Sequence, residues 1–222
     1  MRALVQFGKT KRLRFVSHLD LQRTMQMALR RTDLPVAYSQ GFNPHPLIAF
    51  ASALAVSHTS EAEVLDIRLA ADVSASFVLG QMRGALPPGL PVMNVTTVDD
   101  RERAMMALVT AADYEIEVVG APLDPPARAF LEKNEVFAMR KTKSGERICD
   151  IRPMVHGMTV SQTDGKQTVS VRLSLTEKAT LKPDLLMSVL AEGLDVRDIS
   201  VHRKMLLKTI EEGYVPLLEG FL

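Results

Sequence analysis

Short stretches of alternating apolar and polar residues predict the strands of the first hundred residues. The first of them is followed by a polar GKTK turn and a second strand-like stretch. An irregular QGFNPHP loop and the apolar run 47–56 separate the early strands from the later ones. The predicted strands are residues 2–7, 12–16, 36–39, 63–70 and 90–98.

Two helices interrupt these strands. Ser17 begins the first helix, because Ser17 and Asp20 have the spacing of a capping box, and Pro35 stops it. The second helix covers residues 74–86. The order is therefore β-α-β-β-α-β, with extra strand material at the start. One face of the first helix is apolar and carries Leu21, Met25, Ala28, Leu29 and Thr32.

The second half repeats this order of elements without repeating the sequence. Residues 99–113 predict a short connecting helix between the halves. We predict an α+β protein made of two tandem ferredoxin-like (split β-α-β) domains with antiparallel sheets, residues 1–100 and 113–222. The elements of the second half are a strand at 114–119, a helix at 125–134, two strands within 135–155 around a Ser144-Gly145 turn, a hairpin at 157–175 turned at Asp164-Gly165, a helix at 182–194 and a strand at 195–207.

Composition narrows the class of protein. Apolar residues make up 46% of the chain and charged residues 24%, which is ordinary for a globular protein. Cys149 is the only cysteine, so the chain forms no internal disulfide and holds neither an iron–sulfur cluster nor a thiolate zinc site. The first residues lack a signal-peptide-like apolar stretch, and no apolar run is long enough to span a membrane. We expect a cytoplasmic protein with no membrane contact and no cofactor.

The net charge of +1 hides an uneven distribution. From Arg2 to Arg31 there are eight basic residues, and Asp20 is the single acid. Such a segment favours an anionic partner, most often a nucleic acid, and the alternative is a solvated basic face.

The densest group of unusual residues runs from Arg14 to Pro46. Gly41 can take a positive φ, and Pro44 and Pro46 stiffen the loop, which presents aromatic and amide side chains. Aromatic rings stack on bases, amides bond base edges and guanidinium groups pair with phosphates, so we predict an RNA-binding surface. In the alternative, Phe42 and the prolines only pack the loop on the sheet. The predicted binding residues are Arg14, Arg30, Arg31, Tyr38, Gln40, Phe42, Asn43 and His45.

The same segment resembles the radical-SAM-linked protein family, known as domain of unknown function 2344. Arg14–Asp20 is similar to the family pattern R-F-x-S-H-L-D, and Arg30-Arg31 is similar to the R-R that follows it. Tyr38–Pro46 is similar to Y-S-x-G-F-N-P-H-P, and Ser60–Ile67 is similar to S-x-x-E-x-L-D-I. Pro87–Leu90 is similar to the family's P-x-G-L element. The resemblance covers the first hundred residues well and the second half loosely. One departure is Ser57-His58, where a glycine is expected in the turn.

The resemblance implies an accessory role. Such domains occur fused to, or encoded beside, radical SAM proteins, and this chain lacks the C-x-x-x-C-x-x-C motif that binds their cluster. We therefore expect a non-catalytic accessory or RNA-binding module. Its partners would be a radical SAM enzyme on a separate chain and RNA, in RNA modification or processing.

Two other functions remain open. In one, the chain is a metal-independent endoribonuclease of the CRISPR repeat-associated type, in which His18 or His45 acts on an RNA 2′-hydroxyl. Helix geometry favours structural roles for His18 and Asp20 instead, and His18 with His45 lacks the local spacing of a metal site. In the other, the chain is only a protein–protein adaptor.

Overall fold

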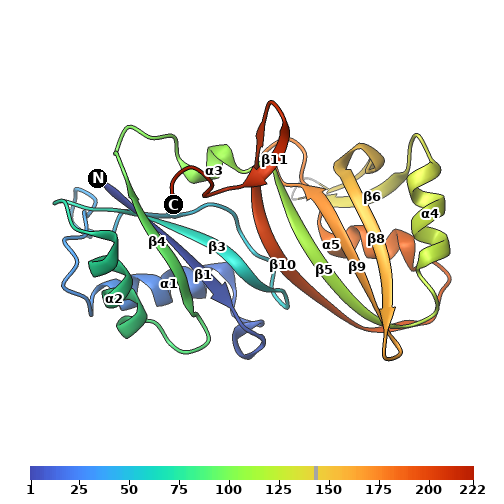
Figure 1. Ribbon diagram of the computed structural model, residues 1–222, viewed down its shortest axis with the longest axis horizontal. Coiled ribbons are helices and arrows are strands. Elements are labelled where there is room, and N and C mark those ends of the chain that lie inside the picture. Colours follow the sequence, from blue (N-terminus) through green and yellow to red (C-terminus); the bar gives the residue numbers. More distant parts are fainter. Residues whose placement is uncertain (143–144) are drawn as a thin grey trace. The chain divides into compact units, whose positions relative to one another are not determined.

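The computed structural model describes residues 1–142 and 145–222, which form two compact units (Figure 1). The first unit contains residues 1–109 and 208–222, and the second contains residues 110–207. Within the described residues the protein is a mixed α+β structure with antiparallel strands and five α-helices, which confirms the predicted fold class at this level.

In the first unit, β3 lies between two other strands. Ile67 of β3 pairs with Ala3 of β1 on one side and with Ile48 of β2 on the other, and β4 pairs with the second edge of β1. The order is β4-β1-β3-β2, and every pairing is antiparallel. The elements of this sheet and its helices are β1 (Arg2–Lys9), α1 (His18–Leu29), β2 (Ile48–Phe50), β3 (Thr59–Arg68), α2 (Ala75–Ala85) and β4 (Val92–Val98).

The helices pack on one face of this sheet. Alternate residues of β1, namely Ala3, Val5 and Phe7, are fully buried in one cluster with the apolar side chains of α1 and α2. The helix starts are fixed locally, because Ser17 Oγ accepts a hydrogen bond from Asp20 N (3.2 Å) as the predicted cap requires. A 3-10 helix (Lys11–Leu13), the four-residue α3 (Met105–Leu108) and β11 (Gly213–Pro216) complete the unit.

The second unit has a four-stranded antiparallel sheet in the order β10-β5-β9-β8. Tyr114, Ile116 and Val118 of β5 are buried, whereas the alternate residues Asp113 and Glu115 point to the opposite face. A separate two-stranded hairpin, β6–β7, is inserted between α4 and β8. The elements are β5 (Ala111–Gly120), α4 (Asp124–Glu132), β6 (Phe137–Thr142), β7 (Gly145–Asp150), a 3-10 helix (Arg152–Met154), β8 (Val155–Thr163), β9 (Lys166–Ser174), α5 (Pro183–Leu190) and β10 (Val196–Ile210).

Several predicted elements differ from the structure. Residues 12–16 are not a strand, because a 3-10 turn and the Val16 N to Leu13 O bond (2.9 Å) lead the chain from β1 into α1. The predicted strand 36–39 is reduced to isolated bridges, Val36 with Leu69 and Tyr38 with Pro46. Residues 208–222 belong to the first unit, although the sequence placed them with the second half.

The predicted turn at Ser144-Gly145 lies partly outside the described residues, because Ser144 is not among them. Among the described residues, no helix combines the length and the hydropathy needed to cross a membrane.

Candidate functional site

The motif loop, residues 38–46, rises from a hydrogen-bonded base at the end of β3. Ala37 N donates to Arg68 O (2.9 Å), and Arg68 N donates to Leu47 O (3.0 Å). These bonds attach both ends of the loop to the last residue of β3. The loop is therefore a defined projection and not a free linker.

Ser39 and His45 brace the inside of this loop. The Ser39 backbone N–H donates to His45 O (3.0 Å), His45 N donates to Ser39 Oγ (3.1 Å), and Ser39 Oγ lies 2.9 Å from His45 Nδ1. Gly41 takes a φ of +121°, which other residues rarely adopt. Phe42 is fully exposed, so the alternative in which its ring packs on the sheet is wrong.

A second exposed ring lies before α1. Phe15 is 68% exposed, and the Arg14 guanidinium carbon lies 4.3 Å from the centre of its ring. This stacked arginine and aromatic pair presents a flat cationic surface to solvent. We call Arg14, Phe15 and His18 the helix-start cluster.

A buried lysine holds the helix-start cluster in place. Lys9 is 1% exposed, and its Nζ donates to Arg14 O (3.1 Å) and Val16 O (3.0 Å). Burial lowers the pKa of Lys9, and the charge of Glu63 partly offsets this effect. The ammonium group thus fixes the backbone on both sides of Phe15.

His18 packs as helix geometry predicted. Its ring lies edge-to-face against Phe50, with 4.9 Å between the ring centres. Asp20 accepts hydrogen bonds from Ser17 Oγ (2.7 Å) and from Arg23 (3.1 Å), which is a capping arrangement. Neither residue is arranged as an acid–base pair with the other.

The structure separates the predicted site residues into two groups. The helix-start cluster precedes or begins α1, while Arg30 and Arg31 follow its last residue, and twelve helical residues span about 18 Å. The backbone N–H of Ser57 donates to Arg14 O (2.8 Å), so the helix-start cluster lies near the beginning of β3. The motif loop is attached to the end of the same strand. Ten strand residues span about 34 Å, so His18 and His45 belong to different groups.

The two arginines after α1 have different surroundings. Arg30 is exposed, whereas Arg31 Nη2 donates to Ala85 O at the end of α2 (2.9 Å). Arg31 also borders a recess of about 390 Å³ beside Gly80 and Gly84. Arg31 therefore contributes to the α1–α2 packing as well as to the surface. Tyr38, Gln40 and Asn43 are exposed in the motif loop.

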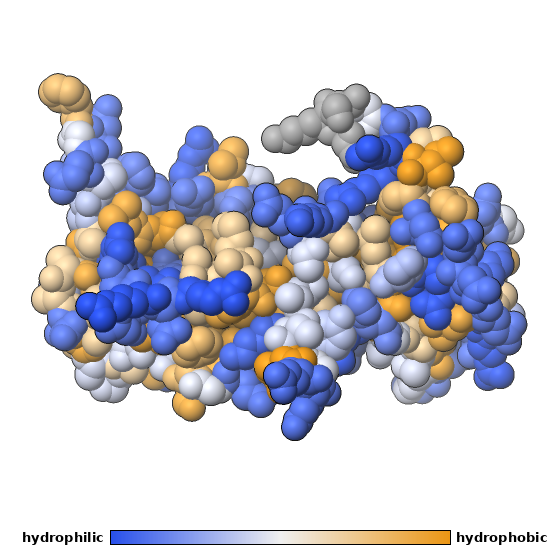
Figure 2. All heavy atoms as spheres, turned by 90° about the horizontal axis from the view of Figure 1, so that it is seen from above, coloured by the Kyte–Doolittle hydropathy of each residue, from blue (hydrophilic) through white to orange (hydrophobic). Residues whose placement is uncertain are grey.

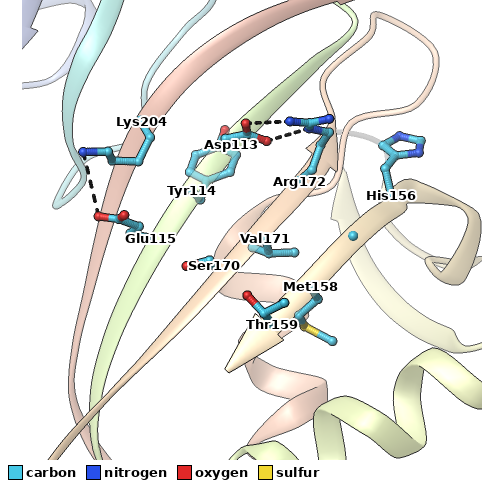
Figure 3. A pocket seen from close by; sticks show the side chains of 11 residues that line it. Asp113, Tyr114, Glu115, His156, Met158, Thr159, Ser170, Val171, Arg172 and Lys204 are labelled. Carbon is cyan, nitrogen blue, oxygen red and sulfur yellow. Dashed lines mark hydrogen bonds and ion pairs between the residues drawn. The ribbon is translucent and has the colours of Figure 1, made fainter. Parts of the chain in front are cut away.

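The second unit has a recess of about 440 Å³ on its sheet (Figure 3). Arg172 donates to both Asp113 carboxylate oxygens (2.7 and 2.9 Å), and Lys204 Nζ lies 4.0 Å from a Glu115 oxygen. His156 Nε2 lies 2.7 Å from Ser174 Oγ, and partial burial together with Arg172 lowers the pKa of His156. The recess is lined by balanced charges, by hydroxyl groups and by the apolar residues Met158 and Val171.

Across residues 1–142 and 145–222, no group of three or more His, Cys, Asp or Glu side chains is positioned to hold a metal ion. Cys149 is a free, half-buried thiol.

Comparison with known proteins gives the family. A family model described as an uncharacterized protein conserved in bacteria, domain of unknown function 2344, matches residues 2–183. The chain belongs to this family. Among solved structures, it is similar to an unknown protein from Galdieria sulphuraria, with 12% identity over 90% of this chain and 97% of that one and a TM-score of 0.25. No curated protein matches it.

Lys9 and Phe15 were not among the predicted site residues. Lys9 occupies an inward position in the alternation of Ala3, Val5 and Phe7, which is the signal that could have found it. Phe15 was counted as a strand residue, so its exposure was missed.

Proposed function

We propose that this protein is a non-catalytic RNA-binding accessory module. The observation that carries the proposal is the exposure of two aromatic rings, Phe15 against the Arg14 guanidinium group and Phe42 in the braced motif loop. Exposed rings stack on unpaired bases, and guanidinium groups pair with phosphates.

The order of the strands supports a tandem ferredoxin-like fold, which is part of the proposal. Numbered within each unit, β4-β1-β3-β2 and β10-β5-β9-β8 both follow the order 4-1-3-2 around a β-α-β-β-α-β chain. In the second unit β8 is the second strand of this count, and β6–β7 is an insertion.

The radical SAM enzyme of the proposal is a separate chain. The family resemblance supports such a partner, and a single cysteine leaves the iron–sulfur cluster to another protein. The role proposed for this chain is to hold RNA for modification or processing by that enzyme.

Fluorescence anisotropy with a labelled, unstructured 30-nucleotide oligouridylate tests RNA binding by the full chain. Phe42→Ser should weaken binding about 5- to 150-fold, the range of one base–aromatic stack. Phe77→Ser, which changes a 40% exposed ring on α2, is the matched control and should have little effect. The affinity should fall steeply with salt. If the oligouridylate does not bind the full chain at low salt, the proposal is refuted.

Arg31→Ala and Asn43→Ala should weaken the same complex. Because Arg31 donates a hydrogen bond to Ala85, its loss should also cost roughly 1 kcal/mol of stability, so melting must be measured on the same samples. Gel analysis of the incubated RNA reports the endoribonuclease alternative. Cleavage that disappears in His18→Ala or His45→Ala would favour it.

A docking role is the second candidate. Leu19, Met27 and Val56 are each at least half exposed in the first unit, and exposed apolar side chains also mark protein interfaces. The test uses the radical SAM enzyme encoded beside this chain. The adaptor function would be selected if this enzyme binds the chain, if Leu19→Ser abolishes the binding, and if added RNA does not change the affinity.

A further inference from the structure

The recess on the sheet of the second unit exists because one position of the sheet face is a glycine. Two rows of directly paired residues cross β5, β9 and β8 on this face. They are Asp113, Arg172 and Gly157 in one row, and Glu115, Ser170 and Thr159 in the other. A Cβ placed on Gly157 would meet no atom of the described residues within 4 Å, apart from its chain neighbours. The first row thus ends in a gap, which opens into the recess (Figure 3).

The floor of the recess is the surface of the sheet between these two rows. Tyr114, Val171 and Met158 form this middle row. Figure 2 shows that apolar side chains also reach the surface elsewhere, in separate groups between charged ones, which is normal for a protein in water. The recess differs because its largely apolar lining is hollowed and has polar groups on both sides, as small-molecule sites do. A flat ring can lie on such a floor and direct its polar edge at the two rows.

The charges around the recess balance, which favours a ligand without net charge. Arg172 donates to both carboxylate oxygens of Asp113, and Lys204 lies beside Glu115 in the same way. Burial lowers the pKa of His156, so its ring is uncharged at neutral pH. A zwitterion such as an amino acid would have to break these ion pairs to form its own.

Carboxylates along β5 disfavour a ligand that carries a phosphate group. Asp113, Glu115 and Glu117 occupy alternate positions of this strand, so the three share the face that contains the recess. A phosphate on this face would meet like charge, which weakens binding. This surface therefore differs from the basic one that we propose for RNA in the first unit.

Glu115 decides which neutral ring fits best. Its carboxylate lies 4.0 Å from Lys204 Nζ, which is too far for a hydrogen bond, and the Glu115 side chain is 46% exposed. An ionised carboxylate only accepts hydrogen bonds, so it suits an N–H group of the ligand. In nucleic acids, glutamate accepts from the exocyclic amino group of cytosine. The hydroxyl groups of Ser170 and Thr159, in the same row, can donate to or accept from other atoms of the ring.

We propose that the recess binds a nucleobase with an exocyclic amino group, as a nucleoside without a phosphate. The ring lies on the floor between the two rows, and its amino group donates to Glu115. This site is separate from the RNA surface proposed for the first unit and does not depend on it.

NMR titration of the isotope-labelled full chain with single nucleosides tests this inference. The probes are adenosine, guanosine and cytidine, with uridine as the matched ligand that lacks the amino group. At least one of the three should shift the amide signals of Gly157 and Thr159, with a dissociation constant of about 1 mM or lower. Uridine should bind at least about fivefold more weakly than that nucleoside. The corresponding nucleoside monophosphate should also bind more weakly than the nucleoside.

Two substitutions with matched controls locate the site. Gly157→Val should weaken binding at least about tenfold, because its side chain fills the recess and excludes the ring. Ser161→Val adds the same side chain to the same face of β8 outside the recess and should change the affinity little. Glu115→Gln adds no bulk and should reduce the preference over uridine to less than about twofold, because an amide donates as well as accepts. Glu117→Gln, on the same face of β5, should keep the preference.

The outcomes can overturn either the site or its ligand. If none of the three nucleosides binds, or if Gly157→Val binds as tightly as Ser161→Val, the recess is not a nucleoside site. If uridine or the monophosphate binds at least as tightly as the nucleoside, or if Glu115→Gln keeps the preference, the assigned ligand is wrong. Oligouridylate has no amino group on its bases, so its binding tests the proposed function separately. Circular dichroism of each variant confirms that a loss of binding is not unfolding.

Discussion

Replacing Lys9 by methionine should destabilise the first unit and release the helix-start cluster. The ammonium group donates two hydrogen bonds, of 3.1 and 3.0 Å, to the carbonyls of Arg14 and Val16. Hydrogen bonds from a charged group contribute about 1.5–3 kcal/mol each. Methionine fills the same apolar space and removes the cost of burying a charge, so we expect a net loss of about 2–4 kcal/mol.

Urea unfolding followed by far-UV circular dichroism measures this loss. Lys11→Met is the matched control, because Lys11 is exposed, and it should change the free energy of unfolding by less than about 0.5 kcal/mol. Phe15 should also become mobile in Lys9→Met, which NMR relaxation of its backbone amide would detect. A Lys9→Met protein as stable as the control, with an unchanged Phe15 amide, would refute the positioning role of Lys9.

Three further substitutions test local features of the two units. Ser57→Gly should stabilise the chain by about 1 kcal/mol in urea unfolding, because Ser57 has a φ of +72° in the turn where the family pattern has glycine. Gly120→Ala should cost about 2–4 kcal/mol, because Gly120 has a φ of +128° and a Cβ there would overlap the Asp195 carbonyl, while Gly157→Ala meets open space and should be neutral. The pKa of His156 is lowered in the folded chain, so the unfolded chain takes up this proton first as the pH falls. The contribution of His156 to stability is therefore intact above pH 6.5 and is lost as the pH falls below that value. His156→Gln should flatten the decline of the free energy of unfolding as the pH falls below 6.5, measured by urea unfolding at a series of pH values.

The helices could be predicted from the sequence because their signals are local. Ser17 and Ser74 each accept a hydrogen bond from the backbone N–H three residues later, and a serine cap followed by an apolar stripe is visible in the sequence. The strand prediction at 12–16 failed for the opposite reason. The alternation of side chains there is typical of a strand, but hydrogen bonds from Lys9 and Ser57 determine the conformation, and Ser57 lies far away in the sequence.

The candidate site could be predicted only as a set of residues. The aromatic and basic side chains were identifiable by type, yet their division into two groups depends on the length of α1 and on where β3 begins and ends. The exposed face of the β6–β7 hairpin in the second unit was missed, because Phe137, Met139 and Ile148 have the composition of buried strands. Their exposure follows because only the opposite face of this inserted hairpin, which carries the buried Ala138, is anchored.

The outward face of α1 connects the two groups of the first unit. Leu19, Arg23, Met27 and Arg30 are exposed and recur at intervals of four, four and three residues, so they form one stripe along the helix. An RNA strand lying on this stripe would meet the guanidinium groups of Arg23 and Arg30. The two ends are too far apart to share contacts, so their effects should add. Arg14→Gln combined with Arg30→Gln should therefore weaken oligouridylate binding by the product of the single effects, and a double variant no weaker than the worse single one would show that only one end binds RNA.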